Sequence, residues 1–162
     1  MEASETQRMH LQRKIRRLII FFMVALVLSG VTAFPVQTEL HWLLQYSSKI
    51  PSFLLPWLQS VYAAITETNT KYPMLAYGYD WLAFAHIVIA TAFIGPLKDP
   101  IKNVWIIDWA IFACIGVFPL AFIAGPIRQI PLFHILIDCC FGVIGLIPLL
   151  ICKKWIRQLE RL

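Results

Sequence analysis

Five side chains that can carry charge, donate protons or bind metals stand in or beside apolar runs. Arg128 follows a Gly-Pro pair, and His134 and Asp138 stand four residues apart inside one apolar run. A spacing of four places two side chains on the same face of a helix. Histidine and aspartate are costly in a lipid-exposed helix, so they indicate a functional site. Asp80 and His86 belong to an earlier run and complete the candidate ligand-binding residues.

The composition indicates an integral membrane protein. Of the 162 residues, 59% are hydrophobic and 14% are charged, whereas a soluble domain carries about 25% charged residues. The apolar residues come in long runs, which is typical of transmembrane helices. The sequence therefore predicts one membrane domain, an all-α four-transmembrane-helix bundle, with no room for a second domain.

Four apolar runs are the predicted spans of this bundle. Their predicted boundaries are 18–34, 79–97, 104–124 and 131–152. The remaining segments are a basic N-terminus, an amphipathic outer segment and a basic tail, at 1–17, 35–78 and 153–162. The first run also fits a secretory signal peptide with a small-residue cleavage site. We favour an uncleaved helix, because the basic segment before it is long for a signal peptide.

The outer segment is predicted to hold two short helices. The first covers 38–46, with Thr38 as its N-cap. The second carries one apolar stripe over 50–65, with Pro51 in its first turn. Pro56 is expected to bend or restart this second helix. An amphipathic helix of this kind lies in the plane of the membrane surface or folds over the bundle, and we favour the interfacial placement.

The distribution of lysine and arginine predicts the orientation. Eleven of the fourteen such residues lie in the N-terminal segment, in the turn between the second and third runs, or in the tail. Cytoplasmic segments are enriched in these residues, so both termini are predicted to be cytoplasmic and 35–78 to be outside. The predicted location is the cell inner membrane. The same clusters favour contact with the lipid bilayer over nucleic acid.

This orientation would bring the five candidate residues to one side of the membrane. At ~1.5 Å per residue, His86 lies about 10 Å below the outer surface, His134 about 5 Å and Asp138 about 10 Å. Asp80 and Arg128 lie at the outer rim. We therefore predict an outer-facing polar pocket between the second and fourth spans.

Several functions are compatible with such a pocket, and no motif fixes a reaction. It could bind a small ligand or a lipid headgroup, or dock a partner; His86, His134 and Asp138 could also ligate a transition metal. The two histidines could hold a b-type haem with Arg128 near its propionates, although their depths differ by about 6 Å. His134 oriented by Asp138 could serve an intramembrane enzyme in acid–base chemistry. The alternatives are a structural ion-pair network and a non-catalytic accessory subunit of a larger complex or homo-oligomer.

Other polar and small residues are assigned structural roles. The four cysteines lie in or at the end of apolar runs without a C-x-x-C pair, so neither a zinc ribbon nor a dithiol redox motif is indicated. Asp108 stands near the cytoplasmic end of the third run, and Lys98 or Lys102 is its expected partner. Gly142 and Gly145 predict the close approach of a neighbouring helix.

Overall fold

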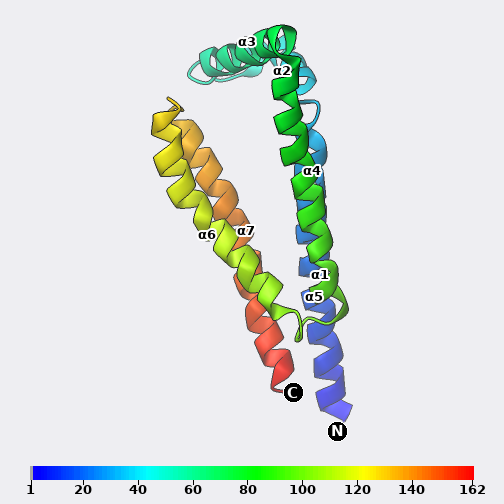
Figure 1. The fold of residues 1–162 in the computed structure, drawn as a ribbon. Helices are drawn as coiled ribbons and strands as arrows, with labels where there is room; N and C mark the ends of the chain where they lie inside the picture. The colour runs from blue at the N-terminus through cyan, green and yellow to red at the C-terminus, as the bar shows by residue number, and fades with distance from the viewer. Residues whose placement is uncertain (1) are drawn as a thin grey trace. The chain divides into compact units, whose positions relative to one another are not determined.

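The computed structural model describes the backbone of residues 2–162 and the side chains of residues 5–162. Within the described chain the secondary structure is entirely helical (Figure 1). Four of the helices are long and apolar enough to cross a membrane. This confirms the all-α class.

The chain divides into two compact units: unit 1 is the chain up to Val24 together with Thr91–Leu162, and unit 2 is Ala25–Ala90.

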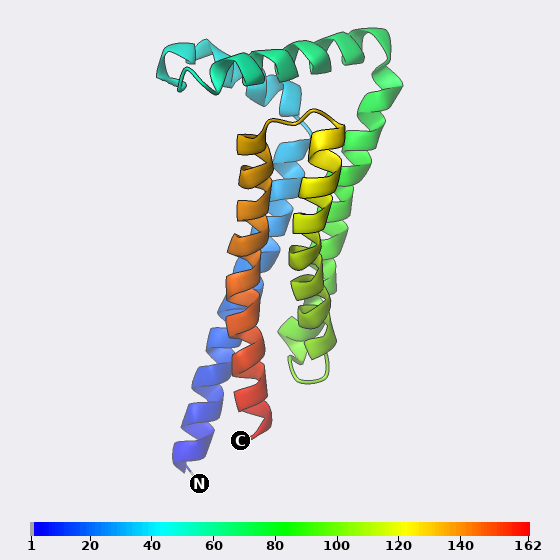
Figure 2. The ribbon, with the colours of Figure 1, turned by 90° about the vertical axis from the view of Figure 1, so that its left-hand side faces the viewer.

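Unit 1 is built around a helical hairpin. Its helices α6 (Val104–Ile127) and α7 (Leu132–Glu160) run antiparallel along each other (Figure 2). The first part of α1 (Glu2–Ala33) and the short α5 (Ile94–Lys98) belong to the same unit. The chain ends therefore lie at the same end of unit 1, where the start of α1 contacts the end of α7 (Figure 1).

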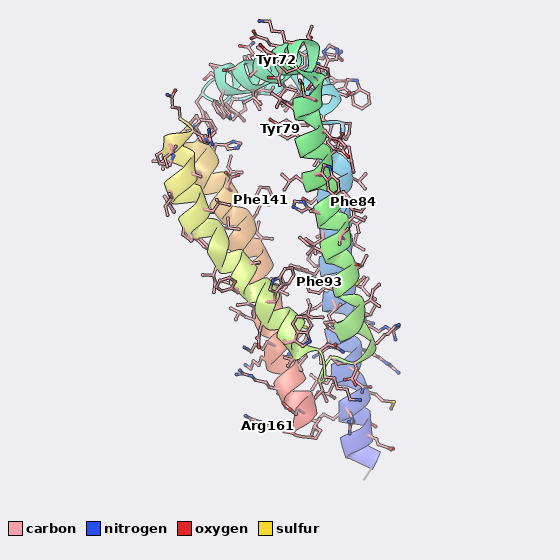
Figure 3. The ribbon with its side chains drawn as sticks, viewed as in Figure 1. Tyr72, Tyr79, Phe84, Phe93, Phe141 and Arg161 are labelled. Atoms are coloured by element: carbon pink, nitrogen blue, oxygen red, sulfur yellow. The ribbon has the colours of Figure 1, made fainter. Side chains whose placement is uncertain are left out.

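The interior of unit 1 is apolar and draws on each of its long helices. Phe93, labelled in Figure 3, is fully buried, and its ring centroid lies 4.9 Å from that of Phe22. The other large side chains that are almost completely buried in this unit are Ile15, Ile19, Pro96, Ile107, Cys152, Ile156 and Leu159. Burial of this kind stabilises a unit by about 1.5–3 kcal/mol for each large apolar side chain in water. The most deeply buried side chains of α7, Ile156 and Leu159, lie toward the end where the termini meet.

Glycines let α6 and α7 approach each other closely. A Cβ atom added at Gly142 would lie 3.0 Å from the carbonyl oxygen of Cys114, and one at Gly145 would lie 2.9 Å from its sulfur. This confirms the predicted close approach at both glycines. Gly125 has the same role near the connecting turn, where a Cβ would lie 2.6 Å from Cδ1 of Ile135.

Unit 2 holds the second part of α1 and the outer segment. Its other elements are α2 (Val36–Gln45), η1 (Ser47–Lys49), α3 (Leu55–Lys71), η2 (Pro73–Leu75) and most of α4 (Ala76–Ala92). Within this unit α1 and α4 touch at Gly30, where a Cβ would lie 2.6 Å from the carbonyl oxygen of Ala83. Helix α3 runs across the direction of α4 (Figure 2).

The observed helices extend beyond the predicted spans. Helix α1 continues through the basic N-terminal segment and α7 through most of the basic tail, while α6 ends three residues later than expected, at Ile127. Lysine, arginine, glutamine and glutamate are good helix formers, so a helix continues past its apolar run. The run at 79–97 is divided, because α4 ends at Ala92 and α5 begins at Ile94.

Three details of the outer segment differ from the predictions. Helix α2 begins at Val36 without a side-chain cap, so Thr38 is not its N-cap. Pro51 precedes α3 and lies outside it, whereas Pro56 stands in its first turn. Proline suits that position because the amide hydrogen it lacks has no partner within the helix there. Because α3 begins at Leu55 with no helix over 50–54, Pro56 neither bends nor restarts a helix begun earlier, and the assignment of Pro51 to the first turn is wrong.

Candidate functional site

The pair formed by His134 and Asp138 stands in the first turns of α7. Its Nε2 and Oδ1 atoms are 3.9 Å apart, and the side chains are 40% and 45% exposed. The predicted sharing of one helix face is confirmed. The distance is near the upper limit for an ion pair, and the attraction exists only while the imidazole is protonated. Neighbouring positions on α7 are exposed and apolar, among them Leu136, Ile137 and Phe141.

Arg128 stands in the turn that joins α6 to α7. The amide of Ile130 donates to the carbonyl of Gly125, and the amide of Gln129 donates to that of Pro126. Gln129 has a φ of 57°, the left-handed conformation usual after a helix end. These bonds form a Schellman motif, which fixes the backbone beside Arg128. The arginine is exposed and forms no ion pair with any described carboxylate of unit 1, including that of Asp138.

Asp80 and His86 belong to unit 2, on α4. Asp80 is exposed, and no described residue of unit 2 forms an ion pair with it. Nδ1 of His86 lies 2.9 Å from the carbonyl oxygen of Leu82. Because a carbonyl oxygen only accepts, Nδ1 must carry the hydrogen of this bond, which leaves Nε2 as the acceptor of the neutral ring. A histidine that binds a metal has its second nitrogen held in the same way.

The proposed metal ligands are thus divided between the units. His134 and Asp138 contact each other in unit 1, and His86 lies in unit 2. Within either unit, no three described His, Cys, Asp or Glu side chains gather as a metal-binding group. A three-ligand centre therefore stays a prediction, as do the haem, acid–base and ion-pair-network interpretations.

A polar contact that the sequence did not predict joins α6 to α7 at the basic end of unit 1. Nζ of Lys153 lies 2.5 Å from Oδ1 of Asp108, with side chains 25% and 46% exposed. The expected partners of Asp108 were Lys98 or Lys102, and this prediction is wrong. Lys102 instead contacts Asp99 at 3.7 Å, within its own turn. No spacing rule connects Asp108 with a lysine on another helix, so sequence offered no signal.

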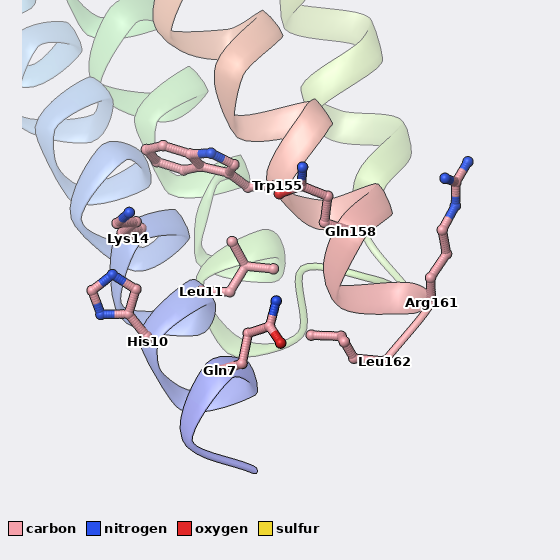
Figure 4. Close-up of a pocket in the computed structure, with 8 residues that line it drawn as sticks. All are labelled: Gln7, His10, Leu11, Lys14, Trp155, Gln158, Arg161 and Leu162. Atoms are coloured by element: carbon pink, nitrogen blue, oxygen red, sulfur yellow. The ribbon is translucent and has the colours of Figure 1, made fainter. Parts of the chain in front are cut away.

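The end of α7 also contacts the start of α1. Nζ of Lys14 lies 5.6 Å from the ring centroid of Trp155, within the range of a cation–π interaction. Beside this contact is an open pocket of about 400 Å³ (Figure 4). Its lining residues come only from α1 and the C-terminal end of the chain: Gln7, His10, Leu11, Lys14, Trp155, Gln158, Arg161 and Leu162. None of these residues was predicted to belong to a site.

A network of polar side chains joins α2 to α3 in unit 2. Gln37 donates from Nε2 to the hydroxyl of Thr66 at 3.2 Å, and Asn69 donates from Nδ2 to Oε1 of Gln37 at 2.6 Å. Nδ1 of His41 lies 3.2 Å from the hydroxyl of Tyr62. His41 therefore connects the two helices of the outer segment.

Comparisons of the chain with models of protein families, with curated proteins and with solved structures find no match.

Proposed function

We propose that this protein is a four-span protein of the cell inner membrane with both termini in the cytoplasm. Four membrane-length apolar helices and the concentration of Lys and Arg near the termini and in the 98–103 segment support this topology. Many large apolar side chains on these helices are exposed, as lipid contact requires, for example Phe112 at 74% and Phe141 at 68%.

The α2–α3 hairpin is proposed to lie on the outer surface of the membrane. The polar network around Gln37 joins the two helices to each other. The stripe residues Leu58, Val61 and Ile65 remain half-buried within the unit. A hairpin whose two helices are joined by a polar network and which carries one apolar stripe suits the boundary between lipid headgroups and acyl chains.

The function we propose is the binding of a small polar ligand by the outer part of α7. The observation that supports it is the half-exposed His134–Asp138 pair on an otherwise apolar helix surface. An aspartate at the centre of a span costs about 2.5–3.5 kcal/mol, and less toward the interface. A bound metal, a lipid headgroup or another hydrogen-bonding ligand would offset part of that cost. Arg128, fixed at the turn before α7, would stand at the rim to receive an anionic group.

The test is to identify what the detergent-purified protein carries. Metal analysis, an absorption spectrum and mass spectrometry of bound small molecules would be applied to the wild type and to His134→Ala and Asp138→Asn. Glu160→Gln is the matched control, because Glu160 is an exposed carboxylate at the other end of α7. We expect the bound species in the wild type and the control, and its loss from the two site variants. Equal retention in all four proteins would exclude the pair from the site.

A second candidate is an accessory subunit of a larger membrane complex. The observation that favours it is that the His134–Asp138 pair is half-exposed, so that a polar side chain of a partner helix could hydrogen-bond to it. Gentle solubilisation followed by mass spectrometry of co-purifying proteins distinguishes the two. Partners lost from Asp138→Asn, together with a wild type free of ligand, would establish the subunit role.

A further inference from the structure

The pocket at the basic end of unit 1 combines cationic and apolar groups. Helix α1 supplies Lys14 and His10, and the end of α7 supplies Trp155 and the amide of Gln158 (Figure 4). None of its eight lining residues is acidic. Leu11, only 8% exposed, forms an apolar floor between the two helices.

The cationic character continues along α7 beyond this pocket. A neighbouring hollow of about 370 Å³ shares Gln158 and Arg161 with it and adds Lys153, Lys154 and Arg157. Lys153 is already paired with Asp108. Lys14 has no described carboxylate within ion-pair distance, and its Nζ lies 5.6 Å from the ring centroid of Trp155. Among the described side chains, the pocket therefore presents a positive charge at Lys14 that no carboxylate pairs with.

We propose that this pocket binds the phosphate group of an anionic phospholipid, with Lys14 as the principal cation. Lysine ammonium and amide N–H groups are donors that suit phosphate oxygens. Trp155 gives the glycerol region an apolar surface, and tryptophan is enriched at that depth. Basic pockets between helices at the cytoplasmic surface are suited to anionic headgroups. The proposal uses the proposed topology and is independent of the His134–Asp138 site.

The experiment compares two neighbouring cations on one helix. The full-length protein would be reconstituted in phosphatidylcholine nanodiscs, and phosphatidylglycerol binding would be titrated by native mass spectrometry. Lys14→Gln removes the pocket cation, and Arg13→Gln removes an exposed charge outside the pocket lining. We expect Lys14→Gln to weaken binding about tenfold more than Arg13→Gln, because only Lys14→Gln removes a charge-assisted hydrogen bond to the phosphate. Equal weakening by the two would show only diffuse attraction and overturn the proposal.

Three further arms complete the design. Lys14→Arg keeps the charge and should retain most of the affinity for phosphatidylglycerol. If Lys14→Arg lost that affinity, the effect of Lys14→Gln would come from a disturbed fold. Thermal unfolding followed by circular dichroism would check this. Inorganic phosphate is the probe for a soluble ligand: if its binding depends on Lys14 and that of phosphatidylglycerol does not, the lipid assignment is wrong. His134→Ala should bind phosphatidylglycerol as the wild type does, so this outcome is separate from that of the outer site.

Discussion

Opposite ends of α7 position polar side chains in two different ways. At the C-terminal end, Lys153 contacts Asp108 of α6 at 2.5 Å, and Trp155 lies beside Lys14 of α1. At the N-terminal end, His134 and Asp138 contact each other along one helix. The first set of contacts joins helices that are far apart in the sequence, and the second is a product of helical periodicity alone.

Buried apolar side chains lie at both ends of α7, Ile135 and Cys139 at the N-terminal end and Ile156 and Leu159 at the C-terminal end, so the difference lies in which elements supply the polar partners. At the C-terminal end these partners stand on α6 and α1, and at the N-terminal end on α7 itself. His134 and Asp138 are 40% and 45% exposed. A pair of this kind adds little to the fold and remains accessible to a ligand or partner.

The largest expected effect comes from the contact that holds the N-terminal end of α7 to α6. Gly125→Leu would place side-chain atoms where Ile135 lies, since even a Cβ would be 2.6 Å from its Cδ1. Overpacking of this kind costs about 1–3 kcal/mol. Equilibrium unfolding of the detergent-solubilised protein, followed by circular dichroism, measures it. Gly116→Leu is the control, because nothing lies within 4 Å of a Cβ at Gly116. Equal destabilisation by both would show that this contact is unimportant.

The next effect is the coupling between Asp108 and Lys153. A double-mutant cycle with Asp108→Asn and Lys153→Gln should give about 1 kcal/mol, the upper end of the range for exposed pairs, because Lys153 is only 25% exposed. The same unfolding measurement applies. The matched cycle uses Asp99→Asn and Lys102→Gln, whose charges are 3.7 Å apart and more exposed. A coupling no larger than in that cycle would show that the partial burial of Lys153 does not strengthen its contact with Asp108.

The turn before α7 offers a smaller gain in stability. Gln129 has a φ of 57°, which costs a residue with a side chain about 1–2 kcal/mol. Gln129→Gly removes that strain, but glycine loses about 0.5–1 kcal/mol more backbone entropy on folding. We expect a net increase of about 0.5–1 kcal/mol in the free energy of unfolding. Gln12→Gly, within α1, should instead be destabilising, and a loss of stability in Gln129→Gly would contradict the role of the left-handed turn.

The features that the sequence predicted are the ones that local rules determine. Four apolar runs predicted four membrane-length helices, and a spacing of four placed His134 and Asp138 on one face. Gly142 and Gly145 predicted a close approach without naming the partner helix. The contact of Lys153 with Asp108 was missed, because it depends on how two helices are rotated about their axes. The same limit applies to the pocket at the basic end, where residues from opposite ends of the chain meet.

The smallest expected effect is the coupling between His134 and Asp138 themselves. A cycle with His134→Ala and Asp138→Asn should give about 0.3–0.5 kcal/mol, the value of exposed pairs four residues apart in a helix. Their distance of 3.9 Å and half-exposed side chains both favour a weak interaction. A coupling larger than that between Asp108 and Lys153 would contradict this expectation. The His134–Asp138 pair would then stabilise the fold, and a ligand that binds there would have to displace a structural contact.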